Sequence, residues 1–176
     1  MNILRRYWVW IGRMHRSKGF GIQSPKDYGF VTEVINEHYP YYAYSKIKTK
    51  DWKTKKLGQL YLRLANWRQP EWMELDEYQE WWEAGKNNIT SNASPFRKGG
   101  SRTIELARMD VAGDWEKMAT RCDSKSVVVV EDIYRDWQRW HSIEQDSRVG
   151  TTFDLYYCGI VWFDEERYPH HYKVNF

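Results

Sequence analysis

The run Ser126-Val127-Val128-Val129-Val130 constrains the fold more than any other stretch of this chain. Consecutive β-branched residues favour an extended strand, and the run lacks the polar alternation that would leave one face in water. A strand that is buried on both faces belongs to a parallel sheet covered by helices. The sequence therefore predicts an α/β fold in which residues 127–130 form a central strand with almost no exposure.

Helical patterns come before this strand. The spacing of apolar residues predicts helices over 3–14 and 53–67. Ser24-Pro25 has the residues of a helix start, because serine can cap the first turn and proline suits its first position. Pro70 ends the second pattern, since a helix does not continue through proline.

The length of 176 residues suits one domain around one core. We expect a basic, helical part at residues 1–67 and a shortened α/β sheet part at residues 71–176. Residues 1–60 hold 12 Lys/Arg and 4 Asp/Glu, which is 12 − 4 = +8, whereas the whole chain carries +3. This basic front is either a solvated face or a surface for an acidic partner.

The other expected strands are shorter or less regular. A strand near 72–75 leads into a helix that ends at Gly85, and a further strand covers 103–107. Thr152–Phe163 and Tyr172–Phe176 have strand patterns and are separated by a short connection, so we expect them to pair antiparallel. Residues 86–101 have little apolar content and are expected to be mostly loop.

Three stretches are distinctive enough to compare with a known family. They are His15-Arg16-Ser17-Lys18-Gly19-Phe20-Gly21-Ile22-Gln23-Ser24-Pro25, Tyr41-Tyr42-Ala43-Tyr44 and the tail from Val127 to Phe176. Together they resemble a group of bacterial class I S-adenosylmethionine-dependent methyltransferase-like proteins. The resemblance implies a Rossmann-like, mostly parallel sheet with a C-terminal antiparallel hairpin, preceded here by N-terminal helices.

The cofactor loop departs from this pattern. Family members that bind S-adenosylmethionine have a glycine-rich turn after the first strand, because any Cβ blocks the close approach of backbone and cofactor. The matching stretch has no glycine and consists of Asp76, Glu77, Tyr78, Gln79 and Glu80. The acid expected to hold the ribose has no match in residues 88–94. We predict that no cofactor binds, and that Trp81 and Trp82 fill the vacated pocket, one pointing inward and one outward.

Three carboxylates suggest a metal site. Asp110 follows the strand at 103–107, and Glu131 and Asp132 follow the valine strand. If these two strands are neighbours, their carboxyl ends place the acids at one edge of the sheet, where oxygen ligands suit a divalent cation. The resemblance implies the same positions, which are similar to the metal site of catechol-type O-methyltransferases. The competing interpretation is that Glu131 and Asp132 only cap the next helix and bind solvent.

Two functions from different classes follow. The first is a non-catalytic methyltransferase-like domain that binds a protein partner, or a second copy of itself, through aromatic and charged surfaces. The second is an active S-adenosylmethionine-dependent methyltransferase that acts on a small acceptor, with or without the help of a divalent cation. A weaker alternative is nucleic-acid binding by the basic front, although the sequence holds no recognised nucleic-acid motif.

The composition also bears on location. No apolar run approaches the roughly 20 residues of a spanning helix, and no signal-peptide pattern is present. Cys122 and Cys158 have no disulfide-framework or metal spacing, so we expect reduced thiols and a cytoplasmic protein.

Overall fold

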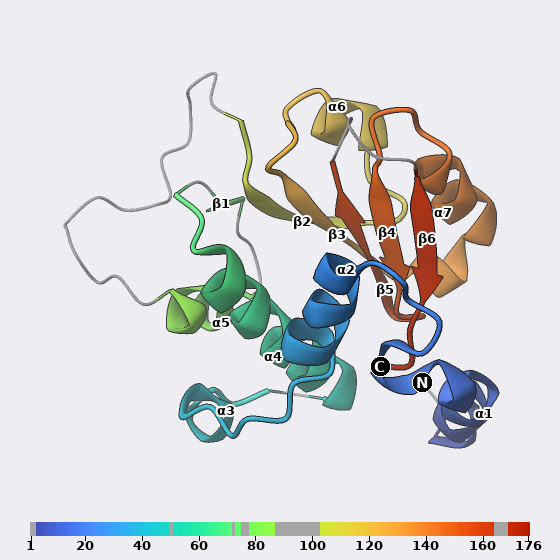
Figure 1. Cartoon of the computed structure of the whole chain (residues 1–176). Helices are drawn as coiled ribbons and strands as arrows, with labels where there is room; N and C mark the ends of the chain where they lie inside the picture. Colours follow the sequence, from blue (N-terminus) through green and yellow to red (C-terminus); the bar gives the residue numbers. More distant parts are fainter. Residues whose placement is uncertain (1–2, 50, 72, 75–77, 87–102, 164–168) are drawn as a thin grey trace.

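The structure is a computed structural model that describes residues 3–49, 51–71, 73–74, 78–86, 103–163 and 169–176. A six-stranded sheet forms its centre, with helices on both sides (Figure 1). The strands are β1 (Met73–Glu74), β2 (Leu106–Asp110), β3 (Val127–Glu131), β4 (Thr151–Asp154), β5 (Cys158–Trp162) and β6 (His170–Lys173).

The strand order is β1-β2-β3-β5-β4-β6. The pairs β1–β2, β2–β3 and β4–β6 are parallel, whereas β5 pairs antiparallel with both β3 and β4. Five strands therefore run in one direction and β5 runs against them. The predicted α/β class with a mostly parallel sheet is confirmed, and an antiparallel hairpin near the C-terminus is present as β4–β5.

Helices precede the sheet, as expected. They are α1 (Ile3–Arg13), η1 (Met14–Gly19), α2 (Pro25–Phe30), the π-helical turn η2 (Val31–Ile35), α3 (Ala43–Lys46) and α4 (Trp52–Arg68). Ser24 caps α2, where its hydroxyl accepts a hydrogen bond from the amide of Asp27, and Asp51 caps α4 through Thr54. The later helical segments are α5 (Gln79–Gly85), α6 (Trp115–Ala119), η3 (Ile133–Arg135) and α7 (Trp137–Glu144).

The valine strand is central and buried, as predicted. Val127 is 4% exposed and the next three valines are fully buried. Val127 and Val129 pack into the apolar cluster that includes α2, η2, α4 and α5, whereas Val128 and Val130 face the cluster that includes α7. This alternation gives the sheet one core on each face.

The prediction for the last strands is wrong in its pairing. Residues 152–163 do not form one strand, because the chain turns at Tyr156, whose φ of 71° is stabilised by its amide donating to Asp154 at 2.8 Å. The resulting β5 lies between β3 and β4, so both of its edges are occupied. β6 therefore takes the remaining edge of β4, and it pairs parallel there.

Two strand boundaries also shift. β2 covers Leu106–Asp110 rather than 103–107, and β6 covers His170–Lys173 rather than 172–176. Most of the loop expected at 86–101 lies outside the described residues. A bilayer-crossing helix needs about 20 apolar residues, and the described part of the chain contains no such helix.

The close packing of α7 on β5 gives a test of the fold. A Cβ on Gly159 would overlap the buried indole of Trp140, whereas a Cβ on Gly29 in α2 would meet nothing within 4 Å. We expect Gly159→Ala to lower the free energy of unfolding by about 1–3 kcal/mol, because a rigid ring must move. Gly29→Ala should leave it unchanged or raise it by up to about 1 kcal/mol. Urea unfolding measures both, and equal effects would contradict the packing of α7 on β5.

Candidate functional site

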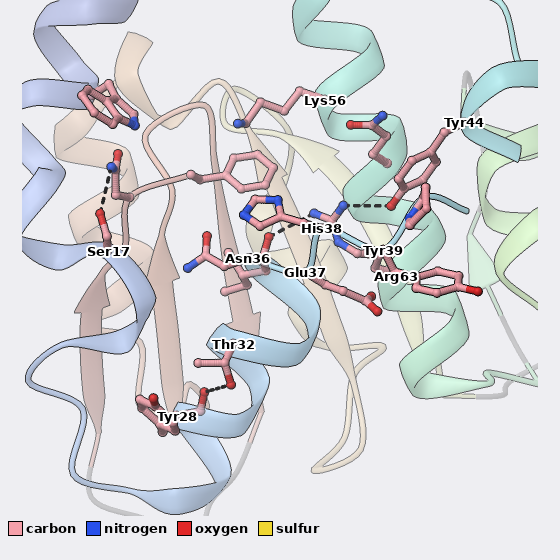
Figure 2. Close-up of a pocket in the computed structure, with 16 residues that line it drawn as sticks. Ser17, Tyr28, Thr32, Asn36, Glu37, His38, Tyr39, Tyr44, Lys56 and Arg63 are labelled. Atoms are coloured by element: carbon pink, nitrogen blue, oxygen red, sulfur yellow. Dashed lines mark hydrogen bonds between the residues drawn. The ribbon is translucent and has the colours of Figure 1, made fainter. Parts of the chain in front are cut away.

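An open cleft of about 730 Å³ lies between the end of η2 and α4 (Figure 2). The chain leaves η2 at Asn36, and the residues that follow form one wall. The other wall is a face of α4, on which Lys56, Gln59 and Arg63 recur at helical spacing. The C-terminal Phe176 also lines the cleft, as does Trp10 of α1.

Arg63 is the buried cation of this cleft, with 6% of its surface exposed. Its guanidinium donates to the carbonyls of Val34 at 2.6 Å and Ile35 at 3.0 Å, which belong to the last turn of η2. A third bond, of 3.0 Å, goes to the hydroxyl of Tyr44. All three acceptors are neutral, and no carboxylate of the described residues forms an ion pair with Arg63. A buried charge with only neutral partners favours an anion nearby.

The phenols beside Arg63 are hydrogen-bond donors at neutral pH. Tyr41 donates to Glu37 at 2.9 Å, and burial, followed by this carboxylate, raises the pKa of Tyr41 to about 12. Burial also raises the pKa of Tyr44, against the opposing effect of Arg63. Glu37, the acid among the residues that line the cleft, is thus already engaged by a hydroxyl.

A donor in the cleft is left unused. The side-chain Nδ2 atom of Asn36 is buried and has no hydrogen-bond partner in the described structure. Figure 2 shows Asn36 on the η2 side, with Lys56 and Arg63 reaching from α4 on the opposite wall. The cleft therefore combines cations and an unused amide with the rings that line it, which suits a ligand with a ring and an anionic or acceptor group.

The carboxylates predicted from the sequence lie elsewhere, at the carboxyl ends of β2 and β3. These strands are neighbours, as the prediction required, and Asp110 is in register with Glu131. Asp110 is exposed and accepts a hydrogen bond from the amide of Ala112 at 2.8 Å. The expectation that the ends of these two strands lie side by side is confirmed.

Glu131 is buried and held by two side chains. Arg108 of β2 donates through Nε to Oε1 at 2.7 Å and through Nη2 to Oε2 at 3.3 Å. The hydroxyl of Tyr61, from α4, also donates to this carboxylate. Burial, and then the negative charge of Glu131, holds the pKa of Tyr61 well above its ordinary value, so the phenol remains a donor. This contact connects α4 to the centre of the sheet.

Asp132 also forms ion pairs with basic side chains. Lys53 of α4 forms an ion pair with its Oδ1 atom, and Arg135 lies 3.1 Å from its Oδ2 atom. Among the described residues, no group of three His, Cys, Asp or Glu side chains could hold a metal ion. Side-chain cations thus neutralise Glu131 and Asp132, and this arrangement does not fit a divalent cation.

The expected cofactor loop is described only in part. Asp76 and Glu77 lie outside the described residues, as do residues 88–94. Tyr78 is buried, and Gln79 and Glu80 begin α5.

The prediction that one of the two tryptophans points outward is wrong, because Trp81 is 3% exposed and Trp82 is fully buried. Trp81 occupies the space above Gly58 of α4, where a Cβ would overlap its indole. Trp82 stacks on Tyr61 with 4.5 Å between ring centroids. The missing side chains at Gly58 and Gly85 let α5 approach α4 closely, because a Cβ on Gly58 would overlap Trp81 and one on Gly85 would overlap the carbonyl of Leu62.

Sequence reasoning missed the cleft residues Asn36, Lys56 and Arg63. A signal was present for Arg63, because it interrupts the apolar stretch Leu60–Ala65, all of which is buried. No comparable signal marks Asn36, whose buried amide results from the end of η2. A scan against family models, a search of curated proteins and a search of solved structures find no match to this chain.

The buried pair at the sheet edge gives a second test. Glu131→Gln removes the charge that compensates Arg108, and we expect it to lower the free energy of unfolding by about 2–4 kcal/mol. Glu74→Gln is the matched control, because its ion pair with Arg121 at 2.9 Å is 45% exposed on both sides. The control should cost less than about 1 kcal/mol. Denaturant titrations of both variants measure the difference, and similar losses would show that Arg108 and Glu131 are not coupled in the core.

Proposed function

We propose that this chain is a methyltransferase-like α/β domain that has lost S-adenosylmethionine binding and acts as a non-catalytic, cytoplasmic binding protein. Its ligand is a small molecule with a ring and an anionic group, held in the cleft between η2 and α4. The observation that carries the proposal is Arg63, a buried cation with neutral partners in the wall of a ring-lined cleft.

The sheet and the sequence motifs support the methyltransferase-like part of the proposal. The sheet is mostly parallel and has an antiparallel hairpin near its end. All three stretches that resemble the family border the cleft, because Ser17, Tyr44 and Phe176 line it. The cysteines Cys122 and Cys158 are free thiols, which is consistent with a reducing compartment.

The packing beside α4 supports the loss of cofactor binding. Tyr78, Trp81 and Trp82 follow β1, and all three side chains are buried. The ring of Tyr61 lies 4.6 Å from that of Tyr78 and stacks on Trp82. Rings packed in this way after the first strand leave less room for a cofactor than the glycine turn that the resemblance implies.

The cleft chemistry supports an anionic ligand. Lys56 and Arg63 supply positive charge, and Asn36 supplies an unused donor. The aromatic walls can contact a ring, as the stacked and edge-on ring pairs elsewhere in the protein do. Positive charge in a partly enclosed cleft also raises the local concentration of anions.

Isothermal titration tests the loss of the cofactor. We expect no saturable binding of S-adenosylmethionine with a dissociation constant at or below about 100 μM, which is about 5.5 kcal/mol. The physical reason is the ring packing after β1 and the lack of a glycine turn. Saturable binding in that range would reject the non-catalytic proposal and favour the active methyltransferase.

Fluorescence titration with 1-anilinonaphthalene-8-sulfonate, an anionic ring compound, tests the cleft. We expect saturable binding to the folded protein, and Lys56→Gln should weaken it about fivefold or more, because a charge-assisted contact to the sulfonate is lost. Near-ultraviolet circular dichroism on the same samples confirms that the binding protein is folded.

Lys55→Gln is the matched control, because Lys55 is the exposed neighbour on the same helix and does not line the cleft. It should bind the probe as the wild type does. Equal weakening by both variants, or no saturable binding, would reject the cleft as an anion site.

A further inference from the structure

The helix α1 lies at the edge of the molecule, apart from the helices that cover the sheet (Figure 1). Its position is set by Arg13, which forms a bidentate ion pair with the buried carboxylate of Asp154, with N–O distances of 2.9 and 3.0 Å. The same guanidinium donates to the carbonyls of Asp154 at 2.9 Å and Val174 at 3.4 Å. This charged side chain therefore fixes the C-terminal end of the helix to the domain.

Five apolar residues in and next to α1 lie away from this anchor, whereas Trp10 lines the cleft. Ile11 precedes Arg13 by two residues, which is about 200° around a helix. Tyr7, Trp8 and Ile11 are neighbours at helical spacing, and 61%, 74% and 53% of their surfaces are exposed. Leu4 and Met14 extend the same exposed stripe by a turn at each end. An amphipathic helix of a globular domain normally buries such a stripe, so α1 presents it for something outside the domain.

The charge of this segment indicates what lies opposite. Residues 1–26 contain six Lys/Arg and no Asp/Glu; the basic residues are Arg5, Arg6, Arg13, Arg16, Lys18 and Lys26. A cationic segment with an exposed apolar stripe is complementary to an anionic, apolar surface. Trp and Tyr strengthen this match, because their rings have an apolar body and a polar atom and favour the headgroup level of a bilayer.

We propose that α1 binds an anionic lipid surface and holds the domain there as a peripheral protein. The helix has 11 residues, a length of about 16 Å at 1.5 Å per residue, which is half the thickness of the hydrocarbon core. It therefore lies in the plane of the interface, with Tyr7, Trp8 and Ile11 among the lipid headgroups and upper acyl chains. This inference goes beyond the proposed function and does not depend on it, because the stripe can bind lipid whether or not the cleft holds a ligand.

Vesicle sedimentation with the full chain tests the proposal. We expect binding to phosphatidylcholine vesicles that contain phosphatidylserine, weaker binding to phosphatidylcholine alone, and weakening by salt. The tryptophan emission should shift to shorter wavelength on binding. The double variant Trp8→Ser/Ile11→Ser should lower the partition coefficient by at least about tenfold, because two large apolar side chains no longer enter the interface.

Tyr42→Ser is the matched control, because Tyr42, which precedes α3, is 71% exposed, close to the value for Trp8. It should bind vesicles as the wild type does. Circular dichroism of all variants checks that the domain remains folded.

Three results would overturn the lipid proposal. The first is no binding to anionic vesicles, and the second is an equal loss in the control and the double variant. The third is a dimer in analytical ultracentrifugation that the double variant dissociates, without vesicle binding, which would assign the stripe to a second copy of the chain. Loss of vesicle binding with intact probe binding in the cleft, or the reverse, separates this inference from the proposed function.

Discussion

The burial of β3 on both faces organises the molecule. Its valines alternate between two apolar clusters, so the chain must supply helices to both sides of the sheet. The segments α2, η2, α4 and α5 cover one face, while α7 covers the other, where Trp140 packs on Gly159 of the neighbouring strand. The two edges of β3 are also paired, one with β2 and the other with β5. The carboxylates at the ends of β2 and β3 and the cleft between η2 and α4 are both arranged around this core.

The helix α4 connects the core to the polar groups. Its apolar face packs on the sheet, yet Tyr61 and Lys53 reach the carboxylates that end and follow β3. Two residues after Tyr61 and on another face of the helix, Arg63 binds the carbonyls that the end of η2 leaves without helical partners. The cleft exists because α4 and η2 are held together by this arginine rather than by apolar contact alone. Arg63 thus has two roles: it holds η2 against α4, and it is a candidate ligand-binding cation of the cleft.

Most residues of the candidate binding features belong to the N-terminal part of the chain, and Phe176 adds to the cleft from the other end. The cleft uses residues of η1, η2, α3 and α4, and Trp10 of α1 contributes to its lining. The exposed stripe of α1 belongs to the same basic segment. The family resemblance pointed instead to the acids at the sheet edge. Of these, Glu131 forms an ion pair with Arg108, and Asp132 forms ion pairs with Lys53 and Arg135. Charge that is neutralised within the fold stabilises it. Residues 1–60 carry more basic than acidic side chains, and this net positive charge attracts anionic ligands and surfaces.

The sequence by itself determined the features that depend on local pattern. The run of valines established a buried strand and hence a helix-covered sheet, and the capping residues at Ser24 and the proline at Pro70 marked helix ends. It also placed Asp110 and Glu131 beyond the ends of two strands, and the structure shows that these strands are parallel neighbours. Their partners were not predictable, since Tyr61 and Arg108 lie 70 and 23 residues from Glu131 along the chain.

Only the tertiary structure decided the strand order and the cleft. The edge available to β6 depended on β5 having inserted between β3 and β4, and no local pattern records which edges are occupied. The burial of Trp81 depended on Gly58, a residue of a different helix. Likewise, the unused amide of Asn36 and the neutral surroundings of Arg63 arise where separate segments meet. Burial and hydrogen-bond satisfaction are properties of the assembled chain, so they follow from which segments meet and not from any one of them.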